Sequence, residues 1–257
     1  MLDYCKQDTE ITYMVAKQLE EDKRKFSKES LQLEHKVRQL LDQQEENGFA
    51  LNLKDAMVLN AQLSDELYEL EQWSLQTFEP TIIELKTKTK EIPFNIASRQ
   101  QIGQRLMDRG WKPTVRTEKD HVVVNEAVLK TITEPDLIPL AKKFIRYFLI
   151  QKRSVMISSW INACRDDGRV HGKVMTLRTV TGRMAHHSPN MAQIPAVYSE
   201  YGKECRSLWT VSNTDTHKLV GTDASGLELR CLAHYLRDDN YTEEILNGDI
   251  HTKNMEL

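Results

Sequence analysis

The sequence predicts an α+β protein, in which a long helical part is followed by a part that mixes strands with helices. Apolar residues recur at helical spacing through most of the first 94 residues, and near Asp167 this pattern gives way to short strand-like runs separated by turns. We therefore place a domain boundary near Asp167. The composition, 40% hydrophobic and 28% charged residues, is typical of an ordinary globular protein.

Three helices are predicted before Pro80. The first carries an apolar face of Ile11, Met14, Val15 and Leu19, and the second carries Leu33, Val37, Leu40 and Leu41 before it ends at Asn47-Gly48. The third opens at Asn52 and carries Leu59, Leu63, Leu67 and Leu70 towards Phe78. We expect this leucine stripe to be core, and the two long helices to pack as an antiparallel pair.

The periodicity lapses after Pro80, where Lys86, Lys88 and Lys90 alternate with other residues. These lysines form either a solvated edge or a contact to phosphates. Ser98 precedes a helix that runs to Gly110, and the N–H groups at such a helix start suit an anion. A further helix is predicted from about residue 137 to 162, and the hairpin-like turn "RDDGRVHGKV" then leads into strands.

The stretch "LVGTDASGLELRCLAHYLRD", residues 219–238, predicts a short buried strand that ends at Asp223, a small-residue turn and a helix. The helix would bury Leu229, Leu232, Ala233 and Leu236. Two interpretations of the turn remain open. Either Asp223 only ends a strand while Ser225 and Glu228 form a capping box, or Asp223 holds a hard cation such as Mg²⁺ beside a phosphate.

The net charge of −3 conceals an uneven distribution. Residues 95–183 contain 17 Lys and Arg against 8 Asp and Glu, whereas the segments on either side are acidic. A local excess of this size is either a solvated surface or the footprint of a bound polyanion.

Cysteine spacing and hydropathy indicate the cellular compartment in which the protein is expected. The four cysteines lie far apart without a C-x-x-C pair, so neither a zinc site nor a disulfide framework is predicted, and buried thiols in a reducing compartment are the simplest account. No apolar run is long enough to span a membrane, and the N-terminus lacks the pattern of a signal peptide. We therefore expect a cytoplasmic location.

Four motifs together resemble one family. They are "TGRMAHHSPNMAQIP" at 181–195, "DASGLELR" at 223–230, "GDIH" at 248–251 and "DYCKQDTEIT" at 3–12. In this order and spacing they resemble the family A DNA polymerases, the group of bacterial DNA polymerase I. The resemblance is closest to the replicative polymerases of short-tailed phages, and it is continuous from about Phe94 to Leu257.

The resemblance implies roles for residues near the C-terminus. Asp223 matches the first palm carboxylate, one of two that hold a pair of Mg²⁺ ions for attack of the primer 3′-hydroxyl, and the Ala224 carbonyl would complete the metal shell. Glu228 matches a glutamate that senses the sugar of the incoming nucleotide. His251 matches a histidine that reaches the triphosphate.

Further roles concern DNA. Arg183 and Gln193 match residues that touch the minor groove near the primer terminus, where all correct pairs present acceptors. Residues 27–166 match the DNA-gripping thumb, in which Ser98, Lys152 and Arg153 are expected to contact DNA. Residues 167–257 match the N-terminal part of the palm with the start of the fingers.

The N-terminal motif resembles the last motif of a 3′–5′ exonuclease domain, to which residues 1–26 are assigned. Tyr4 and Asp8 match its Y-x-x-x-D pair, in which the aspartate binds metal. The other exonuclease carboxylates have no counterpart, so we expect no proofreading by this chain alone. The thioredoxin-binding insertion of some phage relatives is missing between Phe78 and Phe94.

The second palm carboxylate and the R-x-x-x-K helix of the fingers are also missing from residues 1–257. We therefore expect an internal fragment or one half of a split polymerase that is inactive alone. Its expected partners are primer–template DNA, deoxynucleoside triphosphates and a separate C-terminal polymerase fragment, with no membrane. The alternative is a non-catalytic remnant that still binds duplex DNA.

Overall fold

The computed structural model describes residues 2–23, 25–84, 89–248 and 255. The chain divides into two compact units, one from residue 1 to Asp215 and the other from Thr216 to the end. This division does not coincide with the boundary predicted near Asp167, because strands on both sides of Asp167 belong to one sheet. The mixture of helices and strands agrees with the predicted α+β class.

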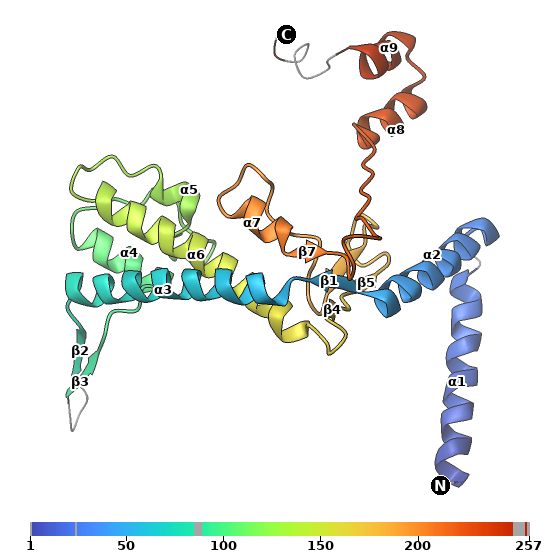
Figure 1. Ribbon diagram of the computed structural model, residues 1–257, viewed down its shortest axis with the longest axis horizontal. Helices are drawn as coiled ribbons and strands as arrows, with labels where there is room; N and C mark the ends of the chain where they lie inside the picture. Colours follow the sequence, from blue (N-terminus) through green and yellow to red (C-terminus); the bar gives the residue numbers. More distant parts are fainter. Residues whose placement is uncertain (1, 24, 85–88, 249–254, 256–257) are drawn as a thin grey trace. The chain divides into compact units, whose positions relative to one another are not determined.

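Helices make up most of the first unit (Figure 1). Their bounds are α1 (Leu2–Lys23), α2 (Lys28–Asn47), α3 (Leu53–Thr77), α4 (Arg99–Met107), α5 (Glu126–Leu129), α6 (Ile138–Ala163) and α7 (Gly202–Ser207). The side chains of Asn52 and Ser98 accept hydrogen bonds from backbone N–H groups three residues on, so the predicted starts of α3 and α4 are confirmed.

Helices α3 and α6 pack side by side and form the frame of the first unit (Figure 1). The leucine stripe on α3 is core as predicted, since Leu59, Leu63 and Leu70 are buried. The expectation that the two long helices α2 and α3 pair is wrong. Helix α2 has no buried residue, whereas α6 buries residues along its whole length and is therefore the better partner for the stripe.

Two hydrophobic clusters lie along this helix pair. The aromatic cluster contains three mutually contacting rings: the Phe78 ring centroid lies 4.4 Å from that of Phe94 and 5.8 Å from that of Phe144, and the last two are 6.3 Å apart. The sheet cluster contains Leu63, Ile150, Ile157 and Trp160, all 0% exposed, and joins α3 and α6 to the strands. The Asn60 amide on α3 also bridges Ser154 and Ser158 of α6.

A three-stranded antiparallel sheet connects distant parts of the chain. Its order is β4 (Arg169–Val170), β1 (Phe49–Leu51) and β7 (Trp209–Thr210), with Phe49 opposite Val170 and Leu51 opposite Trp209. The predicted hairpin-like turn precedes β4 and is closed by a hydrogen bond from the Gly168 N–H to the Arg165 carbonyl.

Two hairpins complete the strands. Strand β5 (Lys173–Met175) pairs with β6 (Ala185–His187), and β2 (Thr81–Glu84) pairs with β3 (Thr89–Ile92). The β2–β3 hairpin occupies the short connection after Phe78, in which the sequence pattern showed no regular element. Lys90 lies in β3, while Lys86 and Lys88 lie outside the described residues.

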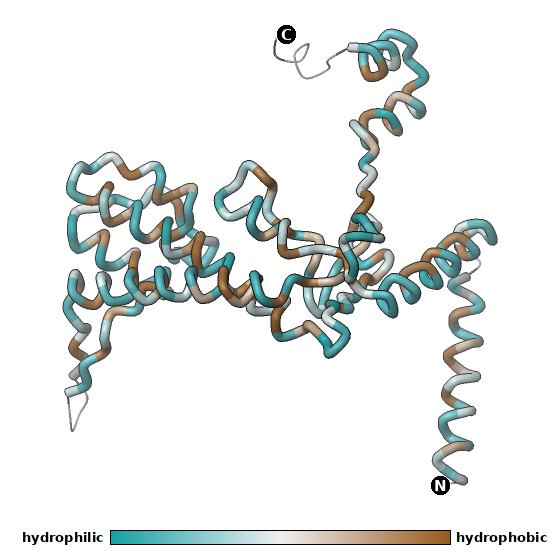
Figure 2. The backbone as a smooth tube through the Cα atoms, viewed as in Figure 1, coloured by the Kyte–Doolittle hydropathy of each residue, from teal (hydrophilic) through white to brown (hydrophobic). Residues whose placement is uncertain are grey.

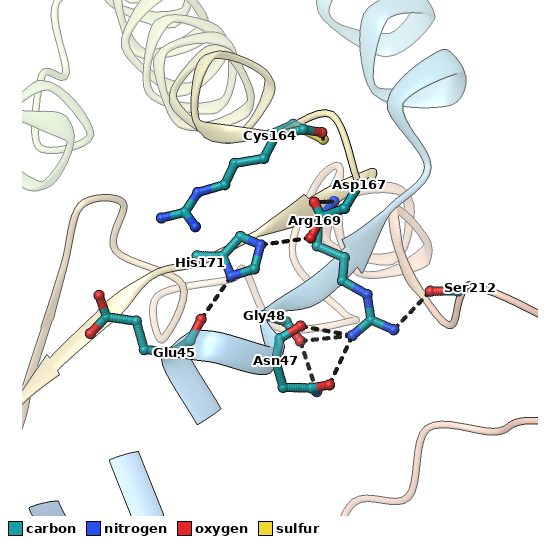
Figure 3. A network of polar contacts seen from close by, with 9 residues as sticks. Glu45, Asn47, Gly48, Cys164, Asp167, Arg169, His171 and Ser212 are labelled. Atoms are coloured by element: carbon teal, nitrogen blue, oxygen red, sulfur yellow. Dashed lines mark hydrogen bonds and ion pairs between the residues drawn. The ribbon is translucent and has the colours of Figure 1, made fainter. Parts of the chain in front are cut away.

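Polar contacts fix the end of α2 against the turn before β4 (Figure 3). The buried His171 side chain donates from Nδ1 to the Glu45 carbonyl at 2.7 Å, and its Nε2 lies 3.0 Å from Asp167 Oδ2. The Arg169 guanidinium binds the Asn47 carbonyl at 2.8 Å and the Ser212 hydroxyl at 2.8 Å. Two hydrogen bonds lower the pKa of Asp167: the larger effect comes from the backbone N–H of Arg169, and a smaller one comes from the His171 side chain.

The second unit contains α8 (Leu227–Leu236) and α9 (Asp239–Asn247), which pack against each other. The strand predicted at Leu219 and Val220 is wrong, because this segment has no regular secondary structure, is exposed and pairs with no strand among the described residues. A short apolar run forms a strand only where other strands pair with it. Of the α8 face predicted to be buried, Ala233 is buried and Leu229 is partly buried, whereas Leu232 and Leu236 are exposed.

Surface exposure corrects two further expectations. Hydrophobic positions recur along α1 (Figure 2), yet Ile11, Met14, Val15 and Leu19 are all exposed. Only Cys205 is a buried thiol, because Cys5 and Cys231 are exposed and Cys164 is half-buried. None of the helices in the described ranges combines the length and apolar character needed to cross a bilayer.

Candidate functional site

A groove of about 760 Å³ lies beside α6 in the first unit. Four segments line it: the start of α4, the start of α5, the middle of α6 and the segment that follows β6. The lining residues are Arg99, Asn125, Glu126, Phe148, Leu149, Gln151, Lys152, Arg153, Val155, Met156, Ser159, Asn190 and Gln193. The groove therefore brings together Lys152, Arg153 and Gln193, which the sequence assigned to DNA contacts from distant positions.

Arg99 is the groove residue that the sequence analysis missed. Its guanidinium stacks 4.4 Å from the centroid of the Phe148 ring and donates from Nη1 to the Val124 carbonyl. A guanidinium has five N–H donors, and this hydrogen bond uses one of them. The position of Arg99 directly after Ser98, within the basic block, was the only signal in the sequence that could have identified it.

Lys152 and Gln193 are exposed side chains of the groove. Arg153 differs, because it is only 7% exposed and its Nε donates to the Glu200 carbonyl at 3.3 Å. The contact to the DNA backbone expected for Arg153 requires an exposed cation, and the burial of this side chain does not fit that role. The structure instead makes Arg153 part of the wall of the groove.

Ser98 lies at the N-terminus of α4, next to Arg99. Its hydroxyl accepts a hydrogen bond from the Gln101 N–H at 3.3 Å, so the side chain caps the helix. The predicted helix start is thus present. Contact between Ser98 and DNA remains a prediction.

Arg183 lies in the exposed connection between β5 and β6 and does not line the groove. Its backbone closes a tight turn with Thr179: the Arg183 N–H donates to Thr179 Oγ1 at 2.8 Å, and the Thr179 N–H donates to the Arg183 carbonyl at 3.2 Å. Gly182, with φ of 75°, supplies the left-handed residue of this turn. Of the two residues that the sequence assigned to the minor groove of DNA, Gln193 lines the groove beside α6 and Arg183 does not.

Asp223 and Ala224 lie in the exposed irregular segment before α8. The capping box, one of the two interpretations left open for this turn, is wrong, because α8 begins after Gly226 and has no side-chain cap, while the Ser225 carbonyl accepts from Arg230 Nε at 2.8 Å. Glu228 is exposed in the first turn of α8. His251 lies outside the described residues.

The residues that the structure describes do not make up the two-metal site that the resemblance implies. Asp223 is the only carboxylate between residues 217 and 227. In the described part of the chain, no three His, Cys, Asp or Glu side chains gather in a way that could hold a metal ion. Tyr4 and Asp8 lie one turn apart on α1, and both are exposed. Asp223 and Asp8 thus each offer a single carboxylate.

An ion pair attaches the segment from Asn190 to Tyr201, called the strap below, to helix α6. The Arg146 guanidinium on α6 pairs with the carboxylates of Glu66 and Glu200 and lies 3.1 Å from the Tyr201 hydroxyl. The hydrogen bond from Arg146 lowers the pKa of Glu66, and the hydrogen bond to Glu66 in turn raises the pKa of Arg146. Both groups therefore stay charged across the physiological pH range.

Comparison with known proteins gives a consistent result. A model of the family described as DNA polymerase family A matches residues 60–256. The DNA-directed DNA polymerase of Escherichia phage T7 is 30% identical over 347 residues, which covers 99% of this chain and 49% of the relative. The DNA-directed DNA polymerase of Enterobacteria phage T3 matches to the same extent. The chain thus spans about half the length of these curated relatives.

Two further relatives are bacterial. DNA polymerase I of Bacillus subtilis is 32% identical over 176 residues, which covers 66% of this chain and 20% of the relative. The structure of the POL domain of Pol1 from M. smegmatis, in complex with DNA primer-template and dNTP, superimposes with a TM-score of 0.67 at 22% identity. That superposition covers 84% of this chain and 36% of the other, and it shows a likeness of fold.

Proposed function

Since this chain belongs to DNA polymerase family A, we propose that it forms part of a template-directed DNA polymerase that extends a primer during phage DNA replication. The observation that carries the proposal is the groove beside α6. Cationic, amide and aromatic side chains from four segments converge there, and three of these segments belong to the most basic part of the sequence. Primer–template DNA is the proposed ligand of this groove.

The groove has the chemistry of a site that binds DNA without reading its sequence. Lys152 and the stacked Arg99 supply positive charge for phosphates, and Gln193 supplies an amide that can donate to base or sugar acceptors. Ser98, at the start of α4, lies beside Arg99. Arg183 is proposed as a second contact, in the minor groove, made from its own exposed turn.

The second unit is proposed to carry the nucleotide end of the reaction. Asp223 and the Ala224 carbonyl would bind divalent metal, Glu228 would contact the sugar of the incoming deoxynucleotide, and His251 would donate to its triphosphate. Asp223 alone does not complete such a site. We propose that the remaining ligands come from polypeptide outside residues 1–257, such as a separate C-terminal polymerase fragment.

The domain assignment follows the same proposal. Residues 1–26 correspond to the end of a 3′–5′ exonuclease domain, in which Tyr4 and Asp8 are the remaining pair. Residues 27–166 correspond to the thumb, and residues 167–257 to the N-terminal part of the palm with the start of the fingers. A duplex-binding protein without catalysis is the second candidate, because the described residues contain a groove but no metal-binding cluster.

Binding of a fluorescently labelled primer–template, measured by anisotropy between about 50 and 200 mM salt, tests the proposal. Each phosphate neutralised contributes about −0.9 to the slope of log affinity against log salt. We expect a steep slope for the chain, and a slope reduced by about one for Lys152→Ala. The matched control is Lys142→Ala, which removes an exposed lysine of the same helix outside the groove.

Two outcomes would contradict the proposal. A salt dependence that is flat would mean that no phosphate backbone is bound. Equal slopes for the variants at Lys152 and Lys142 would show that DNA binds elsewhere on the basic surface. Primer extension after addition of the missing polymerase portion then separates the catalytic candidate from the duplex-binding one.

A further inference from the structure

Three α6 side chains, seven residues apart, contact the strap. Arg146 binds Glu200 and Tyr201, Arg153 binds the Glu200 carbonyl, and Trp160 Nε1 lies 3.4 Å from the Asn190 carbonyl. Seven residues are close to two helical turns, so these three side chains form one row along α6. Their partners run in the opposite order, which means that the strap lies antiparallel to α6.

This row is rigid where it meets the strap. Trp160 is 0% and Arg153 7% exposed, so both hydrogen-bond donors are fixed by packing. Arg146 is held from its other side by Glu66 on α3. A donor that is already immobile loses little entropy when it binds, and it therefore fixes the backbone carbonyl that it contacts.

Helix α7 also contacts the strap. Arg206 donates from Nε to the Pro195 carbonyl at 2.8 Å. Gly202 packs so tightly that a Cβ there would lie 1.8 Å from the Ala196 carbonyl oxygen. The apolar residues Met191 and Ile194 pack on the sheet cluster. The exposed Gln193 lies between these two inward-facing residues and lines the groove.

We propose that Arg146, Arg153 and Trp160 are positioning residues, which set the place of Gln193 in the groove by holding the strap at both ends. This inference rests on the proposed function, since the consequence is measured as DNA binding through Gln193. It assigns Arg153 a role through the strap instead of through direct contact with DNA. It also gives Arg146, which does not line the groove, an effect on DNA affinity.

A double-mutant cycle between Arg153→Met and Gln193→Ala tests the inference. If Gln193 contributes one net hydrogen bond, Gln193→Ala weakens primer–template affinity about fivefold. We expect Arg153→Met to weaken affinity by a similar factor and the double variant to be no weaker than Gln193→Ala within about twofold. Arg153→Met combined with Lys152→Ala should instead give the product of the two single effects, because Lys152 does not act through the strap.

Two controls keep the test decisive. Trp160→Phe keeps the aromatic packing but removes the donor to Asn190, so it provides a second variant if Arg153→Met fails to fold. Amide hydrogen exchange should rise in residues 190–201 in either variant and stay unchanged in α3. Arg153→Lys, which retains a cationic donor, should recover part of the affinity.

Each remaining outcome identifies what is wrong. Effects of Arg153→Met and Gln193→Ala that multiply would overturn the inference, because they would show independent contacts with DNA. Weakening by Gln193→Ala with no effect of Arg153→Met or Trp160→Phe would overturn the inference while leaving the proposed function intact. Absence of DNA binding by the unaltered chain would overturn both.

Discussion

Truncation of Leu63 to alanine tests whether the α3–α6 frame has the core that supports the groove. Leu63 is 0% exposed and belongs to the same cluster as Ile150, Ile157 and Trp160 of α6. The substitution removes three carbon atoms, which corresponds to about 2.4 kcal/mol at roughly 0.8 kcal/mol per buried methylene. The neighbouring helix residues are themselves fully buried, so a cavity remains and raises the expected loss to about 3–4 kcal/mol.

The matched control is Leu75→Ala on the same helix. Leu75 is 45% exposed, so its truncation forfeits only part of the transfer free energy and leaves no closed cavity. We expect a loss of about 1 kcal/mol. Both variants remove the same atoms from α3, and the difference between them therefore measures burial alone.

Tryptophan fluorescence during urea unfolding is the assay. All four tryptophans lie before residue 216, so the signal reports on the first compact unit without a contribution from the second. Because Trp160 shares a cluster with Leu63, its environment is expected to respond directly. Equal losses for the two variants, or a loss below about 1 kcal/mol for Leu63→Ala, would refute the packing of the leucine stripe against α6.

Three further predictions follow from other parts of the chain. Gly48→Ala should destabilise the first unit by more than roughly 1–3 kcal/mol, because a φ of 59° with a ψ of −177° is a conformation that essentially only glycine adopts and because the added Cβ would meet the His171 ring at 2.9 Å. Gly168→Ala should cost only the backbone strain of its φ of 74°, since nothing lies within 4 Å of its added Cβ, and urea unfolding of both variants checks this difference. The pKa of Asp167 is lowered in the folded state, so its contribution to stability is present above the ordinary carboxyl pKa and is lost as pH falls through the folded value. The difference in unfolding midpoint between wild type and Asp167→Asn should therefore shrink below about pH 4. A difference that is constant with pH would contradict this assignment. In a polymerase completed with the missing portion, Asp223→Ala should reduce nucleotide addition by a factor of about 10³ or more while primer–template affinity stays within about twofold, and retained synthesis would exclude the metal role.

Helices and their caps were predictable where the residues that determine them all lie within one short segment of the sequence. The leucine stripe of α3, the caps at Asn52 and Ser98 and the long helix α6 are set by residues within a few turns of each other, and the structure agrees with each. The predicted strand at Leu219 and Val220 failed for the complementary reason. Strand formation depends on a partner from another part of the chain, which local sequence does not specify.

The candidate site divides in the same way. The sequence assigned Lys152, Gln193 and Arg183 to DNA contacts, but only the fold showed that Lys152 and Gln193 line one groove and that Arg183 is not part of its lining. Arg153 looked like its exposed neighbour in the sequence, and its burial follows from where its position falls on the turns of α6 relative to the strap. Arg99 became visible only through its stacking on Phe148.

The sequence by itself determined the family, the mixed helix and strand class and the basic character of the central segment, because motifs, periodicity and charge are properties of residue order. The tertiary structure decided which helix pairs with α3, which strands share a sheet and which cations reach solvent. Those outcomes depend on competition between surfaces far apart in the chain, and the surface that buries the most apolar area prevails. Helix α6, and not α2, packs against α3, and the groove and the strap both lie along α6.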